Sequence, residues 1–386
     1  MSRVEPATAE ELARFLQECA CRRESLSIGG NQSKRAMGGP VLPSDHILST
    51  AKLNRVLAYE PRDLTISVEA GHSFAGLQQL LHQNGQMIAL DPPFSANATI
   101  GGVVAANSSG PMRRGYGTAR DLVIGMKFAT LEGKLVQTGG MVVKNVAGLD
   151  MGKLMIGSFG TLAVVTSVNF RLHSVPEATE SFLYSIPDLE EALRKRDAIL
   201  TSVLQPIAVD LLSPAFALRF SRRGHLLAIR AGGSRAVLAR YRRELADAEP
   251  LEGEAEQEFW QQVQEMPGTY LHEQPDGVIV RVSSTLQGIL ELPKTVAGAF
   301  ISRAANGITY FYFPAWTSAA SWWRKVDEQQ LHAVIEYGTH EVRSQEKLWL
   351  MPESAPGKNA FAMMEAVKRM FDPDSLLNRR RLYGRI

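Results

Sequence analysis

The 386-residue sequence predicts an α/β protein of the α+β kind with two domains, and three observations carry this prediction. Residues 91–165 are dense in glycine and mix hydroxyl and amide side chains with short Val/Ile runs. From about residue 176 the glycine motifs disappear, and strand-like segments alternate with helix-like ones. A chain of this length usually forms two or three domains. We expect a first domain over residues 1–175, a second over 176–345 and a C-terminal segment over 346–386.

The composition is that of an ordinary folded protein, with 45% hydrophobic and 21% charged residues. The 42 Lys and Arg against 40 Asp and Glu leave a net charge of +2, which gives no basis for nucleic-acid binding. We interpret the basic run at residues 379–381 as solvated. The sequence contains no apolar segment long enough to cross a membrane and no apolar leader at its start, so we expect a cytoplasmic protein.

The cysteine count limits the metal and redox chemistry of the chain. Cys19 and Cys21 are the only cysteines, too close together for a structural disulfide and too few for an iron–sulfur cluster or a four-thiolate zinc site. His72 and His82 have no second ligand at metal spacing, so we predict no metal site. Any iron–sulfur carrier that this protein serves must be another chain.

An amphipathic helix is predicted over residues 9–22. Thr8 and Glu11 form a capping box, and apolar residues recur at helical spacing up to Cys19. Cys19 is therefore expected to be a small buried apolar residue.

The first glycine-rich loop follows a short strand over residues 25–28. It reads Gly29-Gly30-Asn31-Gln32-Ser33-Lys34, and such a loop can wrap its N–H groups and a hydroxyl around a pyrophosphate. A plain hairpin turn explains the same residues equally well. No G-x-G-x-x-G follows a strand and opens a helix, so a Rossmann NAD site has no support.

Hydrophobic periodicity and turn residues predict the rest of the first domain. The helix over 73–82 ends at Asn84-Gly85. After Gly101-Gly102, residues 100–106 should start a helix or tight turn whose free N–H groups face a phosphate-bearing ligand. We expect strands over 47–49, 55–59, 65–68, 87–90, 122–131, 134–138 and 162–170.

The second domain should be a ferredoxin-like α+β layer because strands and helices alternate in it. A charged, mostly solvated helix is expected over 252–264, and Trp316, Trp322 and Trp323 are expected in the core. The predicted strands are 182–186, 208–212, 226–231, 277–282 and 308–313, and the other helices are 188–203, 234–247 and 359–371.

Six short motifs follow one another in the sequence: DPP (91–93), ATIGG (98–102), NSSG (107–110), YGTARDLVIG (116–125), VVKNVAGLD (142–150) and GSFGTLAVVT (157–166). A seventh, FDPDSLLNRRRLY, closes the series at residues 371–383. In this order the motifs resemble the vanillyl-alcohol-oxidase (PCMH-type) FAD-binding family, and within it most closely the E subunits of bacterial glycolate oxidases. The likeness spans nearly the whole chain.

The resemblance implies a two-lobed FAD-binding domain, a cap that shapes the substrate pocket and a C-terminal segment that returns to the FAD domain. Asn31 stands where some relatives carry a histidine bonded to the flavin, so FAD should be non-covalent. The cofactor-binding residues implied are Gly29, Gly30, Asn31, Gln32, Ser33, Pro92, Thr99, Gly101, Gly102, Asn107, Ser109, Gly110, Tyr116, Gly117, Asp121, Lys144, Asn145, Gly148, Asp150, Val165, Asn378 and Arg381.

The family further implies an FAD-dependent oxidoreductase that takes part in converting glycolate, a small 2-hydroxy acid, to glyoxylate. Its partners would be a second FAD-binding subunit and an iron–sulfur subunit, through which the chain would associate peripherally with the inner membrane. Oxidising a hydroxy acid needs a cation for the carboxylate and a base for the hydroxyl proton. His340 and Arg343 are the candidates, with Arg324 and His332 behind them, although each histidine is isolated and better explained as structural.

Two alternatives stay open. The chain could be a self-sufficient FAD-dependent 2-hydroxy-acid dehydrogenase. It could also be a non-catalytic assembly subunit with a decayed FAD site, which the two-glycine first loop suggests and the later motifs oppose.

Overall fold

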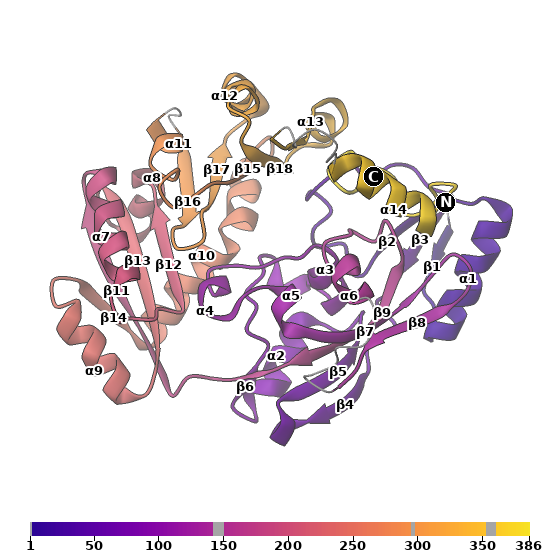
Figure 1. The fold of residues 1–386 in the computed structure, drawn as a ribbon, viewed down its shortest axis with the longest axis horizontal. Helices are drawn as coiled ribbons and strands as arrows, with labels where there is room; N and C mark the ends of the chain where they lie inside the picture. The colour runs from indigo at the N-terminus through magenta and orange to yellow at the C-terminus, as the bar shows by residue number, and fades with distance from the viewer. Residues whose placement is uncertain (1, 142–149, 295–297, 353–359) are drawn as a thin grey trace. The chain divides into compact units, whose positions relative to one another are not determined.

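The computed structural model describes residues 2–141, 150–294, 298–352 and 360–386, and it comprises two compact units (Figure 1). Unit 1 contains Met1–Ser109, Gly117–Val175 and Ser354–Ile386, and unit 2 contains Gly110–Tyr116 and Pro176–Glu353. Helices and strands occur in both units, which confirms the predicted α/β class.

Unit 1 begins with a three-stranded parallel sheet and one helix. The strands are β1 (Ser2–Val4), β3 (His46–Ser49) and β2 (Leu26–Gly29), in that order across the sheet. Helix α1 (Ala9–Arg22) confirms the predicted bounds and buries Leu12, Leu16 and Cys19 in the core. Thr8 caps the helix as predicted, but the Glu11 carboxylate accepts from Ala7 N instead of completing the box at Thr8.

A second sheet of five antiparallel strands forms the other part of unit 1. Strands β5 and β9 are buried at almost every position, because both faces of the sheet are covered. In order the strands are β4 (Val56–Glu60), β5 (Thr65–Glu69), β9 (Val164–Arg171), β7 (Val123–Ala129) and β8 (Leu135–Gly139), and the accompanying helices are α2 (Phe74–His82), α3 (Ile100–Ala105), α5 (Ala119–Leu122) and α6 (Met151–Met155).

The predicted strand over 87–90 is wrong in extent. Only β6 (Gln86–Met87) pairs, with β10 (His173–Ser174). The Gln78 side chain accepts from Ile88 N and donates to Ile88 O, and so replaces the neighbouring strand at the position where pairing stops.

The C-terminal segment closes unit 1 on its first sheet. In the last turn of α14 (Ala360–Phe371), the buried Lys368 ammonium contacts the Asp372 carboxylate and donates to Thr161 O at 2.7 Å. The Asp372 carboxylate in turn accepts from the N–H groups of Leu376 and Leu377, both at 2.8 Å. Leu377 then pairs with Leu26 of β2, so the last residues run beside a strand from the start of the chain.

Unit 2 is built on one antiparallel sheet of nine strands. Unit 2 contains the predicted alternation of strands and helices, but its sheet is wider than the expected ferredoxin-like layer. The sheet is wider because additional short strands, which the sequence pattern did not predict, join it at its edges and in its centre. The order is β14 (Glu249–Glu252), β11 (Ala178–Ile186), β13 (His225–Gly233), β12 (Ala208–Leu212), β16 (Ala299–Arg303), β17 (Ile308–Phe313), β15 (Val278–Ser283), β18 (His332–Tyr337) and β19 (Trp349–Leu350).

Helix α10 (Gly253–Glu273) corrects the expected solvated helix over 252–264. Its Trp260 indole is buried and donates to Ser181 Oγ at 2.7 Å, and the Tyr270 ring packs on Phe216. The helix therefore continues through Pro267 to Glu273, nine residues beyond the expected end. Trp322 and Trp323 of α12 (Trp316–Glu328) are buried, which confirms their core role, whereas Trp316 at the start of the helix is only half-buried. The remaining larger helices are α7 (Leu189–Thr201), α9 (Arg235–Glu244) and α13 (His340–Gln345).

The buried ion pair of the tail yields a stability prediction. We expect Lys368→Met to lower the free energy of unfolding by about 3–5 kcal/mol, because it leaves the buried Asp372 carboxylate without its cation. Urea unfolding of the full chain measures this. Arg369→Met, which removes an exposed cation from the same helix, is the control; an equal effect of both variants would contradict the assignment.

Candidate functional site

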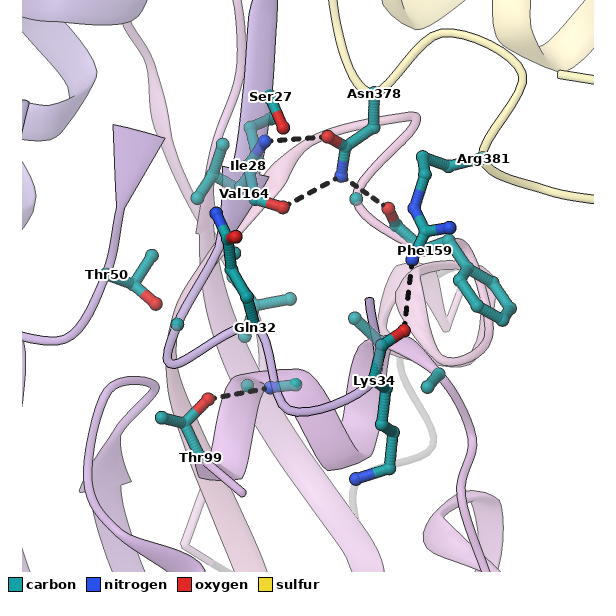
Figure 2. Close-up of a pocket in the computed structure, with 18 of the residues that line it drawn as sticks. Ser27, Ile28, Gln32, Lys34, Thr50, Thr99, Phe159, Val164, Asn378 and Arg381 are labelled. Carbon is teal, nitrogen blue, oxygen red and sulfur yellow. Dashed lines mark hydrogen bonds between the residues drawn. The ribbon is translucent and has the colours of Figure 1, made fainter. Parts of the chain in front are cut away.

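A pocket in unit 1 opens where β2 ends (Figure 2). The loop after β2 forms one wall, helix α3 forms another, and residues from β9 and the C-terminal tail complete it. The predicted site residues that line it are Gly29, Gly30, Asn31, Gln32, Ser33, Thr99, Gly101, Gly102, Val165, Asn378 and Arg381. One pocket therefore brings together residues from the two ends of the sequence and its centre.

Two glycines are required by the close approach of the pocket walls. A Cβ on Gly30 would lie 2.3 Å from Thr99 Oγ1, and one on Gly101 would lie 2.8 Å from the Ala70 Cβ. Atoms this close cannot be accommodated, so the missing side chain of Gly30 lets the loop approach Thr99 at the start of α3, and that of Gly101 lets α3 approach the residue that follows β5.

The N–H groups at the start of α3 correct one expectation. Ile100 N donates to His72 O, Gly101 N to Ala70 O at 2.7 Å, and Gly102 N to Thr99 Oγ1 at 3.3 Å. These groups are already used by the protein, because the chain entering α3 pairs with the residues that follow β5. Helix α3 therefore shapes the pocket wall and does not offer free donors.

The loop after β2 offers the donors instead. Gln32 has a left-handed backbone with φ of 54°, which curls the loop, and its neighbours Asn31 and Ser33 line the pocket with it. Within the described part of the chain, the N–H groups of these three residues donate to no protein acceptor. Successive N–H groups around a left-handed residue form a concave anion-binding turn.

The charge of the pocket is positive. Among the described residues that line it, Lys34, Arg35 and Arg381 are cationic and none carries a carboxylate. The Arg381 guanidinium donates to the carbonyls of Met37, Gly39 and Lys34 and so fixes the loop. Lys34 is the cation whose ammonium is buried against the pocket wall (Figure 2).

Asn378 holds the pocket together from the tail. Its side-chain oxygen accepts from Ile28 N at 2.7 Å, and its nitrogen donates to Ile28 O at 3.1 Å and Phe159 O at 2.7 Å (Figure 2). The amide is fully engaged by the backbone of β2 and of the turn before β9. Asn378 is therefore a positioning residue.

Other predicted cofactor residues lie elsewhere or outside the described residues. Asp121 caps α5 through Thr118, and Asp150 caps α6 by accepting from Lys153 N at 3.2 Å. Asn107 has a buried Oδ1 without a hydrogen-bond partner among the described residues, so it remains able to take a ligand donor. Pro92, Ser109 and Gly117 also belong to unit 1 but do not line the pocket, Gly110 and Tyr116 belong to unit 2, and Lys144, Asn145 and Gly148 lie outside the described residues.

The candidates for chemistry each have a local partner in unit 2. Arg343 is buried and donates from Nε to Gly338 O at 3.0 Å, and exposed His340 contacts Ser344 of its own helix. Arg324 is exposed and donates from Nε to Ala320 O of its own helix at 3.4 Å. Burial lowers the pKa of His332, and its ring packs edge-on against Trp349. These contacts support structural roles for all four.

Sequence reasoning missed a cluster of charges on one face of the unit 2 sheet. Strand register places Asp210 opposite Arg303, and Tyr310 opposite Arg281, on neighbouring strands. Arg303 pairs with Asp210, and Arg281 Nε lies 2.5 Å from the Glu336 carboxylate. No sequence motif marks this cluster, because its members are scattered over strands β12, β15, β16, β17 and β18.

Arg113 gives this cluster a surplus positive charge. Arg113 belongs to the Gly110–Tyr116 segment of unit 2. Burial lowers the pKa of its guanidinium group, and the nearby charges of Arg281 and Arg303 lower it further, whereas Tyr310 raises it. Among the described residues, three guanidinium groups thus lie near two carboxylates, Asp210 and Glu336. Such a half-buried group with excess positive charge is suited to an anion such as a carboxylate.

Comparison with known proteins identifies the first part of the chain. The family model described as an FAD binding domain matches residues 2–139. Residues 2–139 are therefore similar to known FAD-binding domains. Three features of the pocket fit the diphosphate of this cofactor: the closely packed Gly30 and Gly101 (the glycine cradle), the N–H groups of residues 31–33 (the donor-rich loop) and the cationic side chains. FAD is the cofactor, and the expected class of FAD-dependent oxidoreductase is confirmed.

Sequence relatives support the resemblance inferred from the seven motifs. The chain is 28% identical to glycolate oxidase subunit GlcE of Escherichia coli K12 over 98% of both chains. It is 31% identical to a mitochondrial cytochrome-type D-lactate dehydrogenase of Arabidopsis thaliana over 54% of this chain and 36% of that one. Glycolate oxidase subunit GlcD of Bacillus subtilis is 27% identical over 54% of this chain and 44% of that one. The resemblance to the E subunits is confirmed.

Solved structures show the same fold at low sequence identity. p-Cresol methylhydroxylase superposes with a TM-score of 0.75 at 14% identity over 99% of this chain and 88% of its own. Alkyldihydroxyacetonephosphate synthase gives 0.73 at 17% identity over 97% and 75%. At this level of identity the likeness establishes the fold alone. Among the described helices, none combines the length and apolar character that crossing a bilayer requires.

The position of Gly102 in the pocket wall leads to a prediction about cofactor content. Gly102 is exposed on α3, and an added Cβ would meet only Thr99 Oγ1, at 3.1 Å. We expect Gly102→Leu to keep its fold, judged by circular dichroism, and to lose FAD affinity about tenfold or more, since about 1.4 kcal/mol of steric conflict suffices for that loss. Flavin absorbance per protein measures it, with Gly140→Leu, whose added Cβ meets nothing within 4 Å, as the control. Full occupancy in Gly102→Leu would contradict this placement of the cofactor.

The position of Lys34 in the pocket leads to a second prediction, about the strength of FAD binding. Lys34→Gln should weaken FAD binding by about 10- to 100-fold, because a charge-assisted hydrogen bond contributes about 1.5–3 kcal/mol. The binding constant should also depend less on salt than in the unaltered protein. Titration of the FAD-stripped protein measures both, and Lys127→Gln, an exposed lysine of β7, should behave as the unaltered protein does.

Proposed function

We propose that this chain is the FAD-binding E subunit of a glycolate oxidase or dehydrogenase complex. The observation that carries the proposal is the unit 1 pocket, in which a donor-rich loop, a glycine cradle and three cations converge without a carboxylate among its described lining residues. The likeness to GlcE over 98% of both chains supports the complex as its setting.

The residues of the pocket bind and orient the cofactor in this proposal. The N–H groups of residues 31–33 bind the FAD diphosphate, and Lys34 balances its charge. Asn378 and Arg381 hold the loop in the required shape through backbone carbonyls. Asn31 offers no nucleophile for a covalent link, so the flavin is held non-covalently.

When bound by these residues, FAD would supply the hydride-accepting redox chemistry for the conversion of glycolate to glyoxylate, and the hydroxyl proton would go to a base. His340 and Arg343 have structural contacts, which supports a relay role in which a partner subunit provides the base. Electrons then leave to an iron–sulfur partner, since two cysteines cannot hold such a cluster. Membrane association would be peripheral, through these partners.

A second candidate is a self-sufficient 2-hydroxy-acid dehydrogenase, and the guanidinium cluster of unit 2 favours it. Arg113, Arg281 and Arg303 provide the surplus positive charge that a small carboxylate substrate needs. This candidate assigns substrate binding to this chain, whereas the relay assigns it to a partner.

An anaerobic spectrum separates the two. In the relay, the flavin band of the purified chain stays oxidised with glycolate and bleaches only after the partner subunits are added. Bleaching of the chain alone by glycolate or D-lactate would instead establish the second candidate. Acid precipitation should release the flavin into the supernatant in either case.

The cluster sharpens the same experiment. If the chain alone is reduced, Arg281→Gln should raise the substrate concentration for half-maximal reduction by about 10- to 100-fold, since it removes about 1.5–3 kcal/mol of charged hydrogen bonding. Arg219→Gln, which breaks a surface pair with Glu273, is the matched control. Equal effects of both variants would exclude the cluster from substrate binding.

A further inference from the structure

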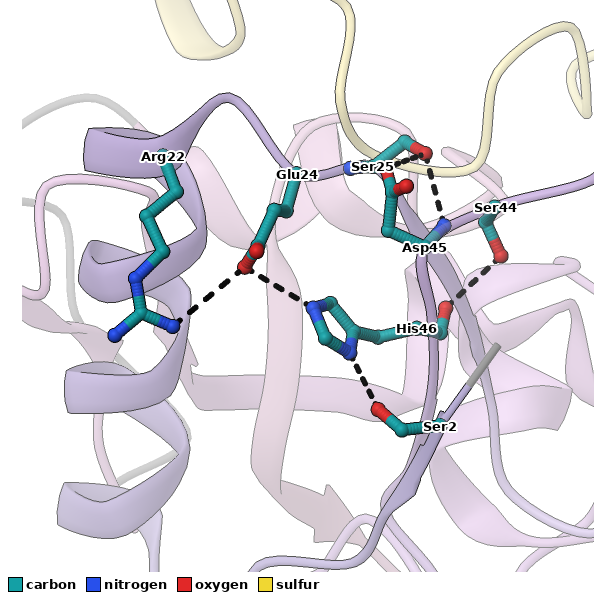
Figure 3. A network of polar contacts seen from close by, with 7 residues as sticks. All are labelled: Ser2, Arg22, Glu24, Ser25, Ser44, Asp45 and His46. Carbon is teal, nitrogen blue, oxygen red and sulfur yellow. Dashed lines mark hydrogen bonds and ion pairs between the residues drawn. The ribbon is translucent and has the colours of Figure 1, made fainter.

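Three side chains of metal-binding type converge at the amino ends of β2 and β3. Cys19 is in the last turn of α1, Glu24 follows that helix, and His46 is the first residue of β3. One donor atom from each lies within 4.8 Å of the other two. Figure 3 shows Glu24 and His46 pointing toward one another, with 3.1 Å between Oε2 and Nε2.

The donor types match zinc. Zinc binds cysteine sulfur at about 2.3 Å and histidine nitrogen or carboxylate oxygen at about 2.0–2.2 Å, so ligand atoms around a tetrahedral ion lie about 3.2–3.7 Å apart. The 3.1 Å between Glu24 Oε2 and His46 Nε2 is close to this range, and the Cys19 sulfur lies within 4.8 Å of both atoms. They come from three different backbone segments, so one ion would link all three.

The surroundings of His46 are those of a metal ligand. Its Nδ1 lies 2.6 Å from Ser2 Oγ, which orients the ring and leaves Nε2 facing Glu24 (Figure 3). Ligating histidines usually engage their second ring nitrogen in this way. The Phe15 ring packs edge-on against the imidazole at 5.3 Å, and the C-terminal end of α1 carries the negative end of the helix dipole.

Other groups nearby limit what the cluster can bind. Burial and then Glu24 raise the pKa of Cys19 to about 11, so the metal-free thiol is protonated and must release its proton when an ion binds. Arg22 Nη1 lies 3.9 Å from Glu24 Oε2, but its side chain is 64% exposed and can turn to solvent. The Asp45 carboxylate accepts from Ser25 N and Oγ, both at 2.7 Å, and so is already engaged.

We propose that Cys19, Glu24 and His46 bind one zinc ion, with water as the fourth ligand. The cysteine sulfur–hydrogen bond gives way to a sulfur–zinc bond and the proton passes to solvent, so the site involves no change of oxidation state. Leu26 pairs with His46 and Gly29 with Ser49, so the pocket lies at the other end of the same parallel strands, about 10 Å away at 3.3 Å per residue. The ion therefore cross-links α1 to the first sheet and does not contact the cofactor.

Zinc content of the full FAD-loaded chain tests the proposal. After growth with zinc and dialysis, elemental analysis should find about one zinc per chain, and X-ray absorption should show one sulfur among four scatterers. Cys19→Ala and Glu24→Gln should each retain at most about a tenth of that zinc under the same dialysis. Flavin content should not change in Glu24→Gln, which separates this site from the proposed function.

Cys21→Ala is the matched control, because Cys21 is the exposed second cysteine and is not among the three ligands. It should hold as much zinc as the unaltered protein. Glu24→Gln preserves shape and hydrogen bonding, so it decides the question even if Cys19→Ala fails to fold. Equal zinc in Glu24→Gln and the unaltered protein, or an absorption spectrum without sulfur, would overturn the proposal.

Discussion

The amide group of Asn378 is the contact on which the shape of the cofactor pocket depends. It joins the strand at residue 28, some 350 positions earlier, to the turn at residue 159 through three hydrogen bonds. A side-chain amide can do this because it donates and accepts at once, as a backbone peptide does. The buried Lys368–Asp372 pair then fixes the segment that carries Asn378. The loop after β2 is thus shaped mainly by residues distant in sequence.

Charge is organised differently in the two units. Among the described residues, the unit 1 pocket gathers cations beside N–H groups that donate to no protein acceptor, and the unit 2 cluster sets three guanidinium groups against two carboxylates. The two arrangements suit anions of different kinds, because main-chain donors suit a diphosphate, whereas planar guanidinium groups suit a carboxylate.

Sequence reasoning succeeded where the signal was local. Thr8 marks a helix start by accepting a hydrogen bond from the N–H three residues ahead, and it caps α1 as predicted. It failed where distant contacts decided the outcome. The first N–H groups of α3 are consumed by Ala70 and His72, and α10 continues past Pro267 because its buried face packs into unit 2. Neither contact has a counterpart in the local sequence.

The sequence by itself determined the fold class, the FAD-binding character of the first domain and most helix and strand positions, because periodicity, caps and glycine motifs act over a few residues. Only the tertiary structure decided which predicted residues form one pocket and which cap helices. It also brought Cys19, Glu24 and His46 together, and the charges of four unit 2 strands onto one face. Such groupings arise from strand pairing and register, which depend on contacts between residues far apart in the chain.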